Sequence, residues 1–289
     1  MKPTSIIFII LAAILIVVGV VVCIVGGSMT DNSAPLLCDV IDAEGNEITT
    51  HSLTEFALSD IDIDMKNVEV NIIGQSTESY IEFKNINTVT YDFVINKHKL
   101  NLSTINPFNI SSMIKFRENE GGFGGLRHYL YLGRYKEKVS QVNIYIAPGQ
   151  ELSSVKIRVK DGDITVKNMI GNTAYDLDAV NGNVIYENTS TEDTLTVSAK
   201  KGNFTFNASS VGALDFIVEN GNSKFTLNKQ YNLSCQCESG KIYLDDENVG
   251  ESYAGVYPQS ASEVGAEVVV PNAIKGKITS GDLVVDTAE

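Results

Sequence analysis

Apolar and polar residues alternate along most of the second half of the chain, in short runs separated by turns. Val155, Ile157 and Val159 form one such run before a turn, and Ile164 and Val166 form another after it. Because successive side chains of a strand point to opposite faces, this alternation predicts strands with one buried face. The turns read "DGD", "NGN" and "KGN", and glycine readily adopts the backbone conformations that tight turns need.

The turn recurs at a nearly constant spacing. The six turn glycines are Gly162, Gly182, Gly202, Gly221, Gly240 and Gly281. Successive members lie 20, 20, 19, 19 and 41 residues apart, the last interval being two periods with an irregular insertion. A fixed period with two strands per unit predicts stacked units, since no single unit can bury its apolar face alone.

We therefore predict an all-β chain, a β-solenoid of stacked strand–turn–strand repeats of about 20 residues. The β-repeat domain is expected over residues 55–289, with the most regular repeats in 151–289. A meandering β-sandwich is the alternative, because hairpins at regular spacing produce a similar pattern. Stacking also brings positions 163, 183, 203, 222, 241 and 282 together, and their residues (Asp, Asn, Asn, Asn, Lys and Asp) predict a structural polar ladder rather than an acid cluster.

The beginning of the chain has a different pattern. Residues Ile6 to Val25 are twenty in number and carry no charge, and a helix of that length spans about 30 Å, the thickness of a bilayer core. We predict a short cytoplasmic tail (1–5), a transmembrane helix (6–27) and a linker (28–54). A cleaved signal peptide is the alternative. Lys2 precedes the span and acidic residues follow it, so the C-terminal domain is expected outside the cell membrane.

Composition and charge narrow the functional classes. The chain has 289 residues and a net charge of −14, which argues against a nucleic-acid-binding protein because such surfaces need clustered Lys and Arg. Four cysteines and three histidines form no metal, redox or nucleophile motif. Cys235 and Cys237 are two residues apart and fit best as buried apolar side chains. We therefore expect neither a catalytic site nor a cofactor or metal site.

Residues 104–138 interrupt the alternation. The segment holds six Lys or Arg and three Glu, so it is basic within an acidic protein. One interpretation is an interaction loop that binds an anionic partner such as a wall polymer or a lipid headgroup. The alternative is a solvated loop with one hairpin at a sheet edge, which binds no such partner. The residues assigned to the interaction loop are Lys115, Arg117, Arg127, His128, Tyr129, Tyr131, Arg134 and Tyr135.

The combination of these segments is similar to a known family. An N-terminal anchor, "DIDIDMKNVEVNIIG", a strand ending in "IAPG", and the repeated "DGDITV", "NGNVIY", "SGKIYL" and "SGDLVV" resemble the bacterial putative-adhesin family of unknown function. Members are membrane-anchored β-strand-repeat proteins at the cell surface, and some accompany cell-envelope stress-response systems. Residues 104–138 and 246–265 depart from the family pattern.

Two functions of different classes follow from these features. The first is a non-catalytic, membrane-anchored, adhesin-like protein at the cell surface, which binds a wall polymer or glycan on its long face. The alternative is a regulatory or scaffolding accessory of an envelope stress response, with a membrane-protein partner. A carbohydrate-active β-helix enzyme is a distant third, because the turn acids do not cluster on one face.

Overall fold

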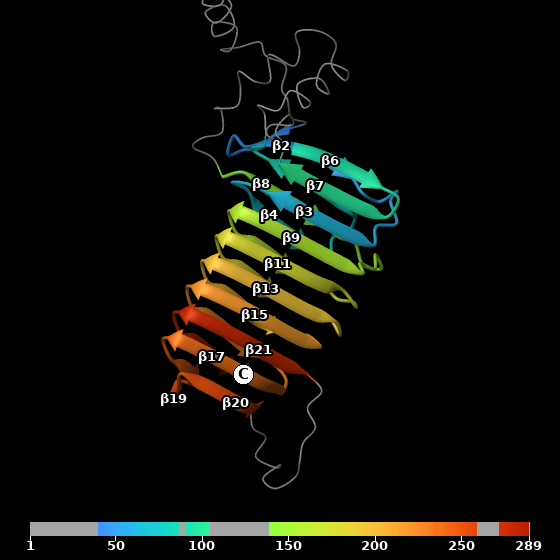
Figure 1. Ribbon diagram of the computed structural model, residues 1–289. Coiled ribbons are helices and arrows are strands. Elements are labelled where there is room, and N and C mark those ends of the chain that lie inside the picture. The colour runs from blue at the N-terminus through green and yellow to red at the C-terminus, as the bar shows by residue number, and fades with distance from the viewer. Residues whose placement is uncertain (1–39, 87–90, 105–138, 259–271, 289) are drawn as a thin grey trace, which may run out of the picture.

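Two long β-sheets make up the fold (Figure 1). The computed structural model describes residues 40–86, 91–104, 139–258 and 272–288. In spatial order the strands of sheet A are β1 (Val40–Ile41), β2 (Glu47–Ser52), β5 (Tyr80–Lys84), β8 (Gln141–Tyr145), β4 (Glu69–Ile73), β10 (Ile164–Lys167), β12 (Val184–Glu187), β14 (Phe204–Ser209), β16 (Ser223–Leu227), β22 (Leu283–Thr287), β18 (Ile242–Leu244) and β19 (Glu247–Gly250). Those of sheet B are β20 (Ser252–Tyr257), β17 (Tyr231–Ser239), β21 (Ala273–Ser280), β15 (Ala213–Asn220), β13 (Thr194–Lys201), β11 (Ala174–Asn181), β9 (Ser154–Asp161), β3 (Asp60–Met65), β7 (Lys99–Thr104) and β6 (Tyr91–Asn96).

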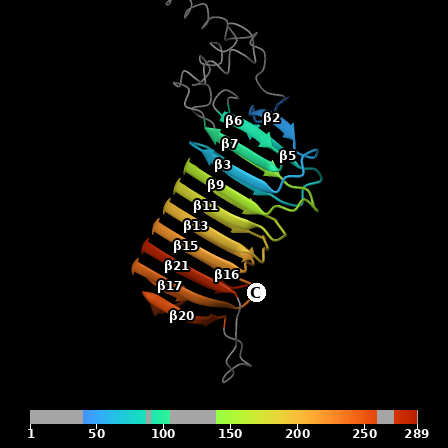
Figure 2. The same cartoon turned by 45° about the vertical axis from the view of Figure 1, so that its right-hand side comes forward.

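Each repeat is one coil, with a strand in sheet B followed by a strand in sheet A. Successive coils pair in parallel, so that Val155 lies beside Tyr175 in sheet B and Ile164 beside Val184 in sheet A. The prediction of an all-β chain with stacked repeats is confirmed for the described residues, which contain no helix. The alternative, a meandering sandwich, requires antiparallel neighbours, whereas these strands are parallel (Figure 2).

Antiparallel strands close both ends of the stack. β1, β2 and β5 extend sheet A at one end and β6 extends sheet B. At the other end β19 and β20 pair antiparallel with β18 and β17. Part of the predicted linker over 28–54 thus forms strands: residues 48–52 of β2 pair along the whole length of β5, and β1 pairs with β2.

The last coil in the chain is not the last coil in the stack. β21 lies between β15 and β17, and β22 lies between β16 and β18. The sequence period places Gly240 before Gly281, whereas in space Gly281 comes first. The long interval between these glycines thus contains a return of the chain into the stack.

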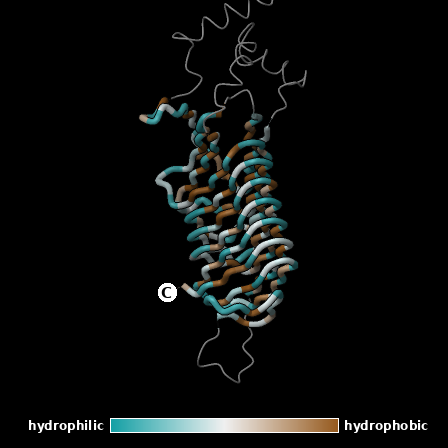
Figure 3. Tube along the Cα trace, turned by 90° about the vertical axis from the view of Figure 1, so that its left-hand side faces the viewer, coloured by the Kyte–Doolittle hydropathy of each residue, from teal (hydrophilic) through white to brown (hydrophobic). Residues whose placement is uncertain are grey.

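The core lies between the two sheets and consists of buried apolar residues at equivalent positions of successive coils. Figure 3 shows such hydrophobic positions, in brown, recurring from coil to coil along the stack. One column in sheet A contains Val166, Tyr186, Phe206, Phe225 and Val285, each fully buried. Tyr186 and Phe206 stack with their ring centroids 5.7 Å apart. Equivalent positions in successive coils therefore touch each other, which is how a coil that cannot bury its own apolar side becomes stable.

The turn glycines form a seam along one edge of the stack. At Gly202, whose φ is 153°, an added Cβ would lie far inside the contact distance of the carbonyl oxygen of Gly182. An added Cβ at Gly182 would likewise clash with the carbonyl oxygen of Gly162, and one at Gly281 with that of Gly221. The absence of a side chain thus permits close approach of coils, in addition to the turn conformation that the sequence suggested. Gly240 is not among the glycines with positive φ, but it approaches Gly281 as closely.

Two sequence predictions lie outside the described residues. These are the apolar segment 6–27 and the basic segment 105–138. Within the described residues there is no helix with the length and apolar character that crossing a bilayer requires. In the sequence the basic segment lies between β7 and β8.

Replacing Gly202 by Ala is expected to destabilise the protein more than replacing Gly250 by Ala. Both glycines have positive φ, but a Cβ at Gly250 meets nothing within 4 Å. Gly250→Ala should cost about 1–3 kcal/mol through backbone strain, and Gly202→Ala should cost about 1–3 kcal/mol more, because neighbouring coils must move apart. Urea unfolding of both variants measures the difference, and equal losses would contradict the seam as described.

Replacing Ser223 by Ala is expected to stabilise the protein. Ser223 is fully buried between Phe204 and Leu283, and its hydroxyl has no hydrogen-bond partner among the described residues. Removing an unsatisfied hydroxyl should raise the free energy of unfolding by about 1 kcal/mol. Ser209→Ala is the matched control, because that buried hydroxyl donates to the Asn207 carbonyl at 2.7 Å and its removal should destabilise. A loss of stability in Ser223→Ala would contradict this account.

Candidate functional site

The polar ladder at the seam is structural. The side-chain oxygen of Asp163 accepts a hydrogen bond from the backbone N–H of Asn183 at 2.7 Å, and Asn183 does the same for Asn203 at 2.9 Å. The pattern continues through Asn222 and Asp282 to the backbone N–H of Lys241. Each oxygen thus holds the next coil in register, which agrees with the ladder expected from the sequence.

The outer face of sheet B carries opposite charges on neighbouring strands. Lys156 of β9 lies beside Asp62 of β3 on one side and Asp176 of β11 on the other. Its ammonium group is 3.0 Å from the Asp176 carboxylate, and Asp62 is 2.7 Å from Lys99. The charges compensate one another across strands, so this part of the face offers no strong field to an ionic ligand.

The outer face of sheet A carries a group of side chains that the sequence did not single out. Tyr80, Glu82, Asn143, Tyr145 and Asn71 form what we call the tyrosine–amide patch, on β5, β8 and β4. The Tyr80 and Tyr145 rings stack with centroids 4.4 Å apart and an interplanar angle of 15°. Asn143 donates to Glu82 at 2.7 Å and accepts from Asn71 at 2.7 Å. Asn143 itself is only 8% exposed, so the patch presents mainly its half-buried tyrosines, Glu82 and Asn71 over an ordered amide.

Strand alternation explains why these side chains point outward. Ile81 of β5 and Ile144 of β8 are fully buried in the core. Tyr80, Glu82, Asn143 and Tyr145 alternate with such core positions, so they lie on the opposite face of the sheet. The antiparallel pairing of β5 with β8 then sets Tyr80 directly beside Tyr145.

The patch is neutral apart from one carboxylate. Burial, together with the nearby charge of Glu82, raises the pKa of Tyr145 to about 12. The same two causes raise the pKa of Tyr80. Both phenols are thus protonated at physiological pH, and each can donate as well as accept a hydrogen bond.

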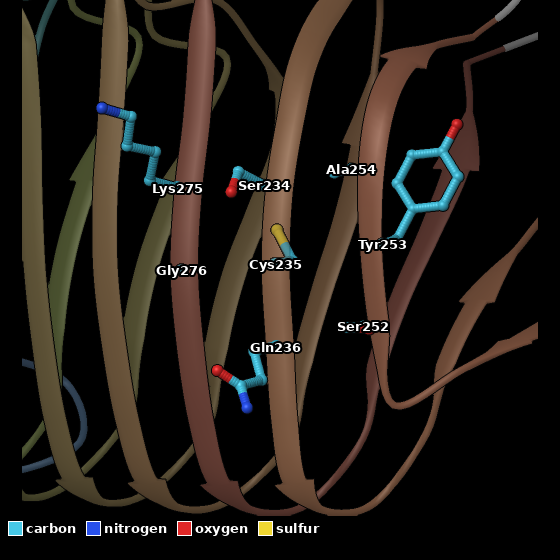
Figure 4. Close-up of a pocket in the computed structure, with 8 residues that line it drawn as sticks. All are labelled: Ser234, Cys235, Gln236, Ser252, Tyr253, Ala254, Lys275 and Gly276. Atoms are coloured by element: carbon cyan, nitrogen blue, oxygen red, sulfur yellow. The ribbon is translucent and has the colours of Figure 1, made fainter.

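A second surface feature is an open depression at the other end of the stack, with a volume of about 430 Å³. Figure 4 shows its lining on three adjacent strands, with Lys275 on β21, Cys235 on β17 and Tyr253 on β20. Ser234, Ser252 and Ala254, which have small side chains, also line it. Its lining contains one charged group and no pair of groups suited to acid–base chemistry, so we assign it no site.

Two thiols and two histidines lie among the described residues. Cys235 and Cys237 are free and buried, and burial raises the pKa of both thiols, that of Cys235 to about 12. The His51 ring stacks on Phe93 with centroids 5.2 Å apart, and the His98 Nδ1 atom is 2.7 Å from the Ala57 carbonyl oxygen. Among the described residues no group of three or more His, Cys, Asp or Glu side chains has the arrangement of a metal site.

The predicted interaction loop cannot be placed on this surface, because all eight of its assigned residues lie in 105–138, outside the described residues. The tyrosine–amide patch was missed because strand pairing, not sequence proximity, assembles it. A signal was present in "SYIEFKN" and "QVNIYIAPG". Both stretches place a tyrosine and a polar residue on the face opposite alternating Ile, Val or Phe.

Comparison with known proteins identifies the family. The family model described as Toastrack DUF4097 matches residues 58–289. The chain belongs to this family. The match confirms the resemblance drawn from the repeats, and it shows that the toastrack domain covers the described strands from β3 onward. No curated protein sequence matches the chain significantly.

Several crystal structures are similar to this toastrack protein. One is a putative cell adhesion protein from Clostridium sporogenes, with 10% identity and a TM-score of 0.43, covering 84% of this chain and 99% of the other. A putative adhesin from Bacteroides fragilis has 12% identity and a TM-score of 0.42, covering 85% and 98%. A putative adhesin from Parabacteroides distasonis has 11% identity and a TM-score of 0.33, covering 84% and 97%.

Both buried thiols are expected to resist alkylation in the folded protein. At pH 8 a thiol whose pKa is raised to about 12 is almost entirely protonated, and the thiolate is the reactive form. Iodoacetamide should label Cys235 and Cys237 only after unfolding in urea, as read by peptide mass spectrometry. Equal labelling rates of Cys235 in folded and unfolded protein would contradict the buried environment.

Proposed function

We propose that this protein is a non-catalytic, adhesin-like module of the cell envelope that binds a repetitive, hydroxyl-rich polymer, a glycan or a wall polymer, through the tyrosine–amide patch. Residues Ile6 to Val25 would hold it at the outer face of the cell membrane. The observation that carries the proposal is the stacked pair of Tyr80 and Tyr145 beside the hydrogen-bonded amides of Asn143 and Asn71.

The chemistry of the patch suits sugar rings. Tyrosine combines an apolar ring face with a polar hydroxyl, and a pyranose likewise combines C–H faces with hydroxyl groups. Amide and carboxylate groups both accept hydrogen bonds from hydroxyls, and the amides also donate. Since Asn143 is already oriented by Glu82 and Asn71, little side-chain entropy remains to be lost on binding.

The surface next to the patch suits a polymer rather than a single small ligand. Asn71 of β4 pairs with Thr165 of β10, and Thr165 pairs with Ile185 of β12. These three residues occupy equivalent positions on neighbouring strands of sheet A. Parallel strands about 4.8 Å apart thus align one side chain per coil in a straight row, in which Asn71 and Ile185 are half-buried and Thr165 is 8% exposed. A polymer with a regular repeat can contact such a row at several points, which adds weak contacts into useful affinity.

Binding to protein-free cell-wall polymer from the producing organism tests the proposal. The double variant Tyr80→Ala/Tyr145→Ala is expected to lose at least about tenfold in affinity, because aromatic anchors dominate such interfaces. Tyr243→Ala is the matched control, since Tyr243 lies on the outer face of the same sheet at its other end and should not affect binding. Full affinity in the folded double variant, or no binding by the wild-type protein, would overturn the proposal.

A further inference from the structure

The C-terminal coil fills an interior position in the stack. We call β21 and β22 the terminal coil. β21 is hydrogen-bonded to β15 on one side and to β17 on the other, and β22 has β16 and β18 as its neighbours. Figure 1 shows β21, in red, between the orange strands β15 and β17. Coil β17–β18 therefore pairs with the rest of the stack only through the terminal coil.

We call the position of the terminal coil the slot. Its two walls are the neighbouring coils, β15–β16 on one side and β17–β18 on the other. Ile274, Ile278, Leu283 and Val285 of the terminal coil are at most 1% exposed and belong to the common core. Without them, one edge of each of β15, β16, β17 and β18 would lack hydrogen-bond partners. Open strand edges beside apolar side chains are templates for pairing with another chain.

The slot is specific for the terminal coil. Gly276 lies between Phe216 of β15 and Cys235 of β17, and the Phe216 ring occupies the space that a side chain at position 276 would need. If β17 stacked directly on β15, the Cys235 side chain would have to enter that space. With the Phe216 ring in its present conformation the direct arrangement is therefore disfavoured, and a strand with glycine at this position fits better.

Charged side chains fix the terminal coil to both walls. Asp286 lies 3.7 Å from Lys224 of β16, and Lys277 pairs with Glu238 of β17. The backbone pairing gives the register of the coil, and these exposed ion pairs agree with it but add little stability. None of them depends on whether the coil and the walls belong to one polypeptide.

The chain that leads into the terminal coil is much longer than the path requires. Tyr257 at the end of β20 pairs with Tyr231, and Ala273 at the start of β21 pairs with Asn232. These ends are separated by two strand spacings, about 10 Å. The residues from 258 to 272 can span up to about 50 Å. The length of this connection therefore lets the coil reach a slot in a neighbouring molecule.

We propose that the terminal coil of one copy of this protein fills the slot of a second copy, so that the chain self-associates by exchange of β21–β22. The exchanged assembly keeps every contact of the slot, and only the path of the connection differs. Insertion into the chain's own slot is favoured at low concentration, since the effective concentration of the attached coil is high. Crowded copies shift the balance toward exchange. The proposal is independent of polymer binding at the patch.

The order of synthesis makes the exchange accessible. Both walls of the slot precede the terminal coil in the sequence, so they can fold before it is available. Once inserted, the coil is bonded on two sides and leaves slowly. Exchange is therefore expected during folding, and refolding at different protein concentrations controls its extent.

A disulfide test distinguishes insertion in one chain from exchange between chains. Asp215 and Lys275 are exposed and directly adjacent across β15 and β21, at a spacing that a disulfide can bridge. Full-length chains carrying Asp215→Cys and Lys275→Cys separately, with Cys23 and Cys38 replaced by Ser, are mixed and refolded. Interchain disulfide between the two variants should increase with protein concentration.

The control pair is Thr196→Cys with Asp215→Cys, which is adjacent across β13 and β15 in the body of the stack. The mixture of Asp215→Cys and Lys275→Cys should give at least tenfold more interchain disulfide than this control. When Asp215→Cys and Lys275→Cys are combined in one chain, the disulfide should form within that chain at low protein concentration. Interchain disulfide no greater than in the control at any concentration would overturn the proposal, as would light scattering that finds only monomer after concentrated refolding.

Discussion

Close approach of neighbouring coils at the glycine seam is the constraint on which the rest of the structure depends. Hydrogen bonding sets the spacing between parallel strands at about 4.8 Å, and this spacing must be kept where the chain turns from sheet B to sheet A. Glycine leaves room there for the preceding coil's carbonyl group, as at Gly202 against Gly182. Asp163 and Asn183 satisfy the backbone N–H groups of the following coils. Together these contacts prevent a coil from sliding along its neighbour.

A fixed register has consequences on both faces of each sheet. On the inner face it stacks Tyr186 on Phe206 and builds a continuous core from units that have none of their own. On the outer face it aligns polar side chains in rows, and at the antiparallel end it places Tyr80 against Tyr145. The same strand register thus positions the tyrosine–amide patch and the core beneath it. A rigid surface suits a repetitive ligand because little order has to be gained on binding.

The sequence predicted those features that repeat with its period. Alternation identified the buried positions of β9 to β16, and the aligned Asp and Asn residues indicated the seam ladder. Features that depend on partners distant in the chain were not predictable. β1 and β2 have no repeat signal of their own and become strands because β5 offers an edge. The order of the last two coils brings Phe216 against Gly276, where the ring fills the space of a side chain, and this packing relation joins residues sixty positions apart.

The interior place of the terminal coil connects the stability of the stack with its ability to associate. Coil β17–β18 and the strands β19 and β20 pair with the body of the stack only when the slot is filled, so the fold is complete only with a terminal coil, its own or another's. The slot and the tyrosine–amide patch lie at opposite ends of sheet A. Exchange of terminal coils would therefore leave both patches free. An exchanged pair would carry two patches on one assembly, and binding of a polymer at both would strengthen attachment without any change in either patch.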